Sequence, residues 1–102
     1  MQDAGAAGLA GSSHMTGLAR LDLSHNRIGS TGARKLAEAA SLAGLRALLL
    51  SHNRVGAAGA RALIASPHLR QLERLELRGN ALNVRGAVAQ ELRQRFGEAV
   101  VL

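Results

Sequence analysis

Residues 18–28 read LARLDLSHNRI, and a closely similar stretch returns as LRALLLSHNRV at 45–55 and as LERLELRGNAL at 72–82. Both steps are 27 residues long. Each copy keeps leucine at its first, fourth and sixth positions and asparagine at its ninth. Internal repeats with a period of about 20 to 50 residues are typical of solenoid architectures. This repeat therefore decides the fold of the chain.

Alternation within each copy predicts a β-strand. In the first copy, Leu21 and Leu23 lie two positions apart, so both side chains point to the same face of an extended chain. We expect that face to be the core. The equivalent core positions of the later copies are Leu48, Leu50, Leu75 and Leu77.

A glycine-punctuated turn and a helical pattern follow the first two strands. A chain that runs from strand to helix to strand places its strands parallel, and each repeat buries its apolar face mainly against its neighbours. The apolar positions are spaced three and four apart, as on one side of a helix. They are Ala33, Leu36, Ala37 and Ala40 after the first strand, and Ala60, Leu63 and Ile64 after the second.

The pattern L-x-x-L-x-L-x-x-N-x-L resembles the leucine-rich repeat. Its period and helical spacers are similar to the ribonuclease-inhibitor-type subclass, which also occurs in Ran GTPase-activating proteins and many bacterial repeat proteins. The resemblance covers essentially the whole chain. It implies an α/β solenoid shaped as a horseshoe segment, with parallel strands on the concave side and helices on the convex side.

Two further columns recur at the 27-residue step. Asn26, Asn53 and Asn80 stand where the family forms a structural asparagine ladder, in which an inward amide satisfies backbone groups of the turn. Gly32, Gly59 and Gly86 form the second column, where we expect glycine to permit a tight backbone path into the helix.

The repeat frame divides the chain into one domain with four parts. Residues 1–17 form a partial repeat that contains only the helix, because Asp3 aligns with Ser30 and Leu9 with Leu36. Residues 18–44 and 45–71 are full repeats, and 72–102 form an atypical C-terminal repeat and cap. An open apolar edge at the N-terminal end would favour self-association.

The C-terminal repeat departs from the pattern of the others. Val84, Val88, Leu92 and Phe96 form an apolar stripe at a spacing of four residues, different from that of the preceding helices. A short fourth strand is predicted over residues 98–102, with Ala99 and Leu102 at the positions of the first two leucines. Atypical terminal repeats usually cap a solenoid.

Composition limits the classes of function. The formal net charge is +6, which raises the question of an anionic partner, but the basic residues are scattered. Cysteine is absent, so disulfides and thiol chemistry are excluded. No apolar run approaches the eighteen or so residues of a membrane span, and the N-terminal residues lack the pattern of a secretion signal. We therefore expect a cytoplasmic location and no contact with a membrane.

Catalysis is not predicted. The best candidates are Asp22, Ser24 and His25, of which the first two share a strand face. The second copy keeps the Ser-His pair but has Leu49 in place of the aspartate, so the repeat itself explains that pair. Nothing in the sequence supplies an evident oxyanion hole or enclosed pocket, and no cofactor is indicated.

A metal site at the histidines was weighed in the same way. His25 and His52 occupy equivalent positions of adjacent strands, about 5 Å apart, which is close enough for two imidazoles to share an ion. Gly79 breaks this column, and a third ligand would have to come from a residue such as Asp22. Two half-exposed turn histidines are the favoured interpretation, and no metal is predicted.

The side chains that flank the core leucines are free to recognise a protein partner. A row of strands holds them with little ordering cost on binding, and Leu49 would serve as a central anchor with a polar rim. Alternatively, the acidic residues of this face only pair with neighbouring arginines. The expected contact residues, on the concave face and the adjacent turns, are Arg20, Asp22, Ser24, His25, Leu49, Ser51, His52, Arg74, Glu76 and Arg78.

The leading hypothesis is a non-catalytic scaffold for protein–protein interaction. The resemblance implies a GTPase-regulatory role as a narrower version, which no specific residue supports. One alternative is a structural C-terminal end of a longer repeat protein. Another is a basic module for nucleic acid, based on the columns Arg27 with Arg54 and Arg34 with Arg61, although Phe96 is the sole aromatic residue available for stacking on bases.

Overall fold

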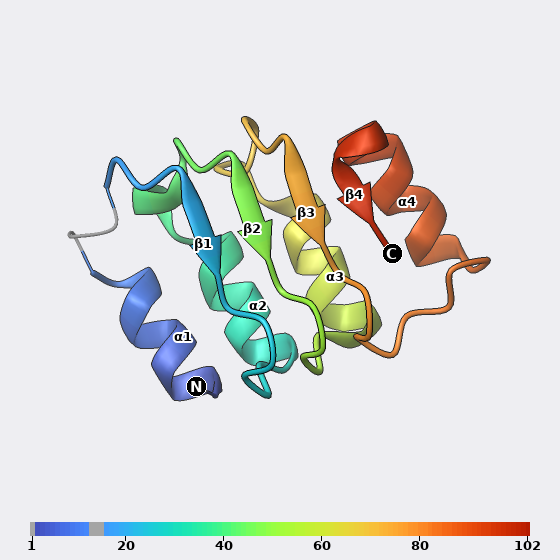
Figure 1. Cartoon of the computed structure of the whole chain (residues 1–102), viewed down its shortest axis with the longest axis horizontal. Coiled ribbons are helices and arrows are strands. Elements are labelled where there is room, and N and C mark those ends of the chain that lie inside the picture. The colour runs from blue at the N-terminus through green and yellow to red at the C-terminus, as the bar shows by residue number, and fades with distance from the viewer. Residues whose placement is uncertain (1, 13–15) are drawn as a thin grey trace.

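A computed structural model of the chain describes residues 2–12 and 16–102, so residues 13–15 of the predicted partial repeat lie outside the described part. The strands of this part form one parallel sheet in the order β1-β2-β3-β4 (Figure 1). The strands are β1 (Arg20–Asp22), β2 (Ala47–Leu49), β3 (Arg74–Glu76) and β4 (Val100–Val101).

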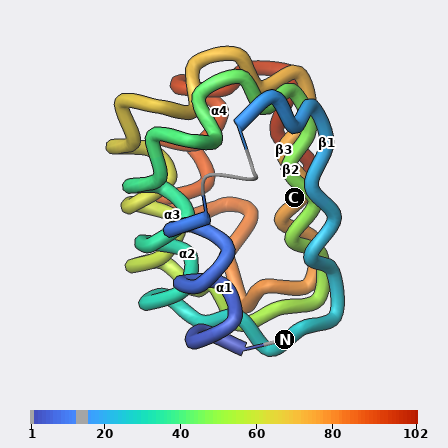
Figure 2. Tube along the Cα trace, turned by 90° about the vertical axis from the view of Figure 1, so that its left-hand side faces the viewer, coloured from blue at the N-terminus to red at the C-terminus, as the bar shows by residue number. Residues whose placement is uncertain are grey.

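Helices precede and follow these strands along the chain, and they cover one face of the sheet. Figure 2 shows the resulting two layers, with strands on one side and helices on the other. The layers make an α/β repeat fold. Within the described residues, none of the helices has the length and apolar character needed to cross a bilayer. The helices are α1 (Asp3–Ala10), α2 (Ser30–Ala37), α3 (Gly56–Ala65) and α4 (Ala87–Phe96), with short 3-10 helices η2 (Ala40–Leu42) and η3 (Gly97–Ala99).

The strand leucines lie in the core, as the alternation predicts. Leu48 and Leu75 are fully buried at the centre of the sheet. Leu21 occupies the same position on β1 but is only half-buried, because β1 is the first strand of the sheet. On the helix side, Leu36 and Leu63 are also fully buried, so the interior is built mostly from aliphatic groups of neighbouring repeats.

Buried amides join the turns that leave successive strands. Asn53 donates hydrogen bonds to the carbonyls of Leu23 (2.9 Å) and Leu50 (3.0 Å). Its Oδ1 accepts from the backbone N–H groups of Asn26 and Ile28, both at 2.9 Å. Asn80 repeats the arrangement one step later, since its amide donates to Leu50 and Leu77 and accepts from the N–H of Val55. The amide column thus connects the backbone of each turn to the preceding repeat.

The glycine column has a different role from the expected one. Gly32 and Gly59 are buried inside the first turns of α2 and α3 and have ordinary helical geometry rather than a special backbone path. A Cβ at Gly59 would lie 3.1 Å from the Cα of Ser30, so this glycine allows α3 to approach α2 closely. Gly86 does not share this environment, because it lies just before α4.

Helix α2 is shorter than the apolar pattern indicated. It ends at Ala37, and Ala40 lies in η2 with its side chain exposed, so its predicted place on the helix stripe is wrong. Ala33, Leu36 and Ala37 are buried as expected.

The C-terminal repeat differs from two predictions. Val84 lies before α4 and is 46% exposed, so it does not belong to the buried stripe. The register also shifts: Arg20 pairs with Ala47 and Ala47 with Arg74, but Leu75 pairs with Val100 and not with Leu102. The cause is the short connection after α4, where η3 leads directly into β4.

Replacement of Asn53 by alanine tests the contribution of the amide column. Five backbone groups would lose a hydrogen bond to this side chain, and we expect the free energy of unfolding to fall by about 3 kcal/mol. Asn26 is the matched control because its side chain is less buried, and we expect Asn26→Ala to cost less than half as much. Urea unfolding followed by circular dichroism measures both. Equal losses for the two variants would contradict a special role for the hydrogen bonds that Asn53 makes to the preceding repeat.

Candidate functional site

The face of the sheet opposite the helices, here called the outer sheet face, carries charges that pair within single strands. The guanidinium of Arg20 lies 4.0 Å from the carboxylate of Asp22 on β1. On β3, the guanidinium of Arg74 lies 3.5 Å from the carboxylate of Glu76. The side chains of Arg20, Asp22 and Arg74 are each more than half exposed, so these pairs contribute little to stability. Asp22 and Glu76 thus each have an arginine of their own strand beside them.

Leu49 lies between these two pairs, and it is not the exposed anchor that the sequence suggested. It is only 5% exposed, although it stands outside the main core cluster. The register places Leu49 between Asp22 and Glu76. Strands lie about 4.8 Å apart, so a leucine flanked by a strand on each side leaves little of its surface to solvent. The outer sheet face therefore offers charged and polar groups rather than an apolar pocket.

Asp22 also holds the start of the first turn. Its Oδ1 accepts a hydrogen bond from the backbone N–H of Ser24 at 3.0 Å. Hydrogen bonds from the hydroxyl and the N–H of Ser24, followed by the nearby charge of Arg20, lower the pKa of Asp22 below its ordinary value. The carboxylate is therefore committed to the turn and to Arg20.

The turns after β1, β2 and β3 lie at the carboxyl ends of the strands, and we call residues 24–28, 51–55 and 78–82 the turn edge. Here the imidazoles of His25 and His52 stack, with ring centroids 4.6 Å apart and planes inclined by 17°. Both residues have left-handed backbone geometry, with φ of 60° and 56°. Gly79 follows in the column with φ of 77°, and the His52 ring lies directly over it.

This geometry does not arrange a catalytic triad or a shared metal ion. In a triad the histidine lies between the nucleophile and the acid, whereas Asp22 contacts Ser24 directly and His25 faces His52. Nearly parallel rings direct their in-plane lone pairs along parallel lines that do not converge on one ion. Within residues 2–12 and 16–102, no group of three metal-ligating side chains is close enough to hold a metal.

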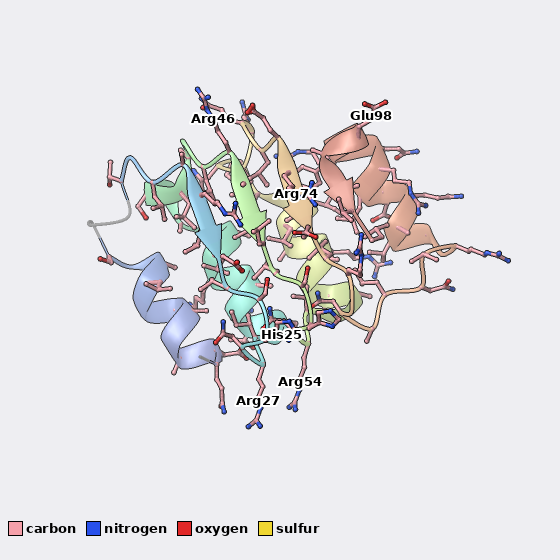
Figure 3. The ribbon with its side chains drawn as sticks, in the orientation of Figure 1. His25, Arg27, Arg46, Arg54, Arg74 and Glu98 are labelled. Atoms are coloured by element: carbon pink, nitrogen blue, oxygen red, sulfur yellow. The ribbon has the colours of Figure 1, made fainter. Side chains whose placement is uncertain are left out.

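The basic columns separate into paired and unpaired arginines. On the helices, Arg34 pairs with Glu38 at 3.7 Å and Arg61 pairs with Glu91 at 3.9 Å. At the turn edge, Arg27 and Arg54 are exposed and extend away from the molecule (Figure 3).

These two arginines form no ion pair with any residue that the structure describes. With the two histidines beside them, they make the turn edge a basic surface that lacks acidic partners of its own. Arg78 is exposed at the start of the third turn and extends this surface along the sheet.

A hollow of about 310 Å³ lies between α3 and the segment that leads to α4. It is lined mainly by alanine, leucine, valine, glycine and asparagine. Its one charged lining residue is Arg61, which is already paired with Glu91. This composition offers neither a nucleophile nor a general base.

Two structural side chains were missed from the sequence. Asp3 accepts a hydrogen bond from the N–H of Gly29 at 2.6 Å, just before α2 begins. Arg95 donates to the carbonyls of Ile64 and Ser66 and lies 5.1 Å from the ring centre of Phe96, so it fastens α4 to the end of α3. The 27-residue alignment of Asp3 with Ser30 did not predict the hydrogen bond to Gly29, because Asp3 binds the backbone of the next repeat.

Comparison with known proteins gives one positive finding. The family model described as "Leucine Rich repeat" matches residues 14–37 and 45–63, which correspond to two of the repeats. No curated protein sequence matches the chain. The family match and the parallel α/β architecture together support a leucine-rich repeat protein.

Removal of the Ser24 hydroxyl should raise the pKa of Asp22 toward its ordinary value. The backbone N–H bond remains, so the rise should be partial. The depressed pKa stabilises the folded state above the unfolded-state pKa, and this contribution is lost as pH falls through the folded-state pKa. Carbon-13 NMR titration of Ser24→Ala measures the shift. Ser51→Ala is the control at the equivalent position, and an unchanged Asp22 pKa in Ser24→Ala would refute the assignment.

Substitution of Gly79 tests the histidine column. A Cβ there would lie 2.5 Å from Nδ1 of His52, and the positive φ disfavours any side chain. We expect Gly79→Ala to displace the His52 ring and to lower the free energy of unfolding by about 1 to 2 kcal/mol. Gly44→Ala is the control, because a Cβ there meets no atom within 4 Å. Histidine ring proton shifts and urea unfolding report both effects; equal behaviour of the two variants would disprove the contact.

Proposed function

We propose that this leucine-rich repeat protein is a non-catalytic scaffold that binds another protein through its outer sheet face and turn edge. Leucine-rich repeat domains generally mediate protein–protein interaction. One observation carries the proposal here: exposed side chains of the turn edge stand on a backbone that buried asparagine amides hold in place. Neither Arg27 nor Arg54 contributes to the core, so both are free for recognition.

Rigidity is what makes such a surface useful for binding. Association costs less when the contacting backbone is already ordered, because little conformational entropy is lost. Asn53 fixes the first turn through the N–H groups on both sides of Arg27, and Asn80 fixes the second turn through the N–H of Val55 beside Arg54. A partner therefore meets the arginines on a preformed frame.

Charge indicates the chemistry of the partner. The outer sheet face neutralises itself through the pairs Arg20–Asp22 and Arg74–Glu76. The turn edge does not, since the described residues provide no ion pair for Arg27 or Arg54. A protein partner with acidic groups opposite the turn edge fits this distribution, because complementary potentials favour the correct encounter.

Several finer assignments accompany this proposal. We assign the chain to the ribonuclease-inhibitor-type subclass, with a 27-residue period, a horseshoe-shaped segment and the repeat boundaries 18–44, 45–71 and 72–102. We place it in the cytoplasm. A GTPase-regulatory role is a narrower version of this proposal. The alternatives are a structural C-terminal end of a longer repeat protein with no binding role of its own and, because the net charge is +6, a module that binds nucleic acid.

A binding experiment with matched surface variants tests the proposal. The chain is used to isolate a protein partner by crosslinking, and the dissociation constant of the purified pair is then measured by calorimetry. We expect Arg54→Glu and Arg78→Glu each to weaken binding about tenfold or more, as loss of a well-placed interface charge commonly does. Lys35→Glu is the control because Lys35 is exposed on α2, away from the sheet; its affinity should stay within about twofold of the parent chain.

Two results would contradict the proposed function. If Lys35→Glu weakened partner binding as much as the turn-edge variants, the turn edge would not be the binding surface. Tight binding to random-sequence RNA or DNA that falls steeply with salt would favour the nucleic-acid module instead.

A further inference from the structure

The outer edge of β1 presents unpaired backbone groups in a defined pattern. The carbonyl of Ala19 accepts from the N–H of Ala47, and the N–H of Leu23 donates to the carbonyl of Leu49, so these odd-numbered residues face β2. Successive residues of a strand direct their N–H and C=O groups to opposite sides. Arg20 and Asp22 therefore direct theirs away from β2, where no strand of the described residues pairs with them.

The side chains on this edge are complementary to themselves. If a second β1 runs antiparallel with Leu21 opposite Leu21, Arg20 of each copy lies opposite Asp22 of the other. In that register Arg20 and Asp22 form the hydrogen-bonded pairs of an antiparallel ladder, and these are the two residues whose backbone groups are available. Backbone and side chains thus select the same alignment.

From this agreement we infer that the outer edge of β1 binds the β1 strand of a second copy of the chain, which makes a two-fold symmetric dimer with one continuous sheet. The interface is isologous, so each contact occurs twice. Four backbone hydrogen bonds and two Arg20–Asp22 pairs form across the axis. This inference does not depend on the proposed binding function of the turn edge.

Other alignments place like charges opposite each other. A parallel pair of β1 strands puts Arg20 against Arg20 and Asp22 against Asp22, and an antiparallel pair shifted by two residues brings one of these like pairs together. Like charges directly opposite are destabilising. Edge strands that avoid pairing commonly carry charges that repel a second copy, whereas the opposite charges of Arg20 and Asp22 attract one.

The core side of the strand gives a second reason for pairing. Leu21 is half-buried, whereas Leu48 and Leu75 at the same position are fully buried. In the proposed register the two Leu21 side chains face each other on the core side as a non-hydrogen-bonded pair, where side chains come closest. Each copy therefore covers the apolar end of the other. The strand contributes only three residues, so the dimer should dissociate on dilution.

The Arg20–Asp22 ion pair within one chain does not prevent these residues from pairing with a second copy. Arg20 and Asp22 of one chain are 4.0 Å apart, at the limit of an ion pair, and their side chains are 68% and 51% exposed. The Arg20 side chain can therefore turn toward Asp22 of the second copy without loss of a buried contact. The hydrogen bond from Ser24 keeps the carboxylate of Asp22 ionised and fixed beside the strand.

Sedimentation equilibrium of the intact chain, from about 5 μM to about 1 mM, provides the test in this range of weak affinity. We expect the average mass to rise from one chain toward two. Arg20→Asp and Asp22→Arg should each remain single chains when measured alone, because each places like charges across the axis.

Mixing the two single variants is the decisive step. A dimer of either variant with itself brings only like charges together, whereas a dimer of one variant with the other brings opposite charges together across the axis. An equimolar mixture should therefore recover dimers. Arg74→Asp and Glu76→Arg are matched controls, because the same charges lie inside the sheet on β3 and both variants should dimerise like the parent chain. A parent chain that stays single at about 1 mM, or a mixture that stays single, would overturn the inference.

Discussion

The structure depends on a few buried amides at the ends of the strands. A parallel strand that turns back toward the helix layer leaves backbone N–H and C=O groups away from water, and such groups are costly when unpaired. Asn53 satisfies groups from its own repeat and from the preceding one, and Asn80 does the same one step later. Because each amide connects two repeats, the turns cannot move independently, and the positions of the exposed side chains follow from the same bonds.

This constraint separates the roles of the two sides of the sheet. On the helix side, Leu48 and Leu75 are committed to the core, and Gly59 lets adjacent helices pack closely. On the open side, the charges of β1 and β3 pair within each strand, and Leu49 of β2 lies buried between these strands. At the turn edge, Arg27 and Arg54 form no ion pair with a described residue, and backbone hydrogen-bonding capacity remains at the edge of β1. The two surfaces that we propose for recognition therefore do not compete with the core.

The sequence predicted the elements that follow from local periodicity and from the repeat. Alternating leucines located the strands, and the 27-residue alignment placed His25 beside His52, although only the structure shows that the rings stack. The errors concern positions whose environment is set by neighbours distant in the sequence. Leu49 is buried between two other strands. Val84 and Leu102 shift because α4 begins late and η3 shortens the return to β4. No alternation or spacing encodes such contacts.

Native-state hydrogen exchange of the turn amides tests the rigid turn edge most directly. The N–H groups of Asn26 and Ile28 donate to Asn53, and that of Val55 donates to Asn80. If the amide column fixes the turn edge, these protons should exchange only through the opening that also exposes the core amides, at rates close to that of Leu50. Rapid exchange of the turn amides, as in a surface loop, alongside slow exchange of Leu50 would show that the turns open on their own, and a preformed binding surface would then be excluded.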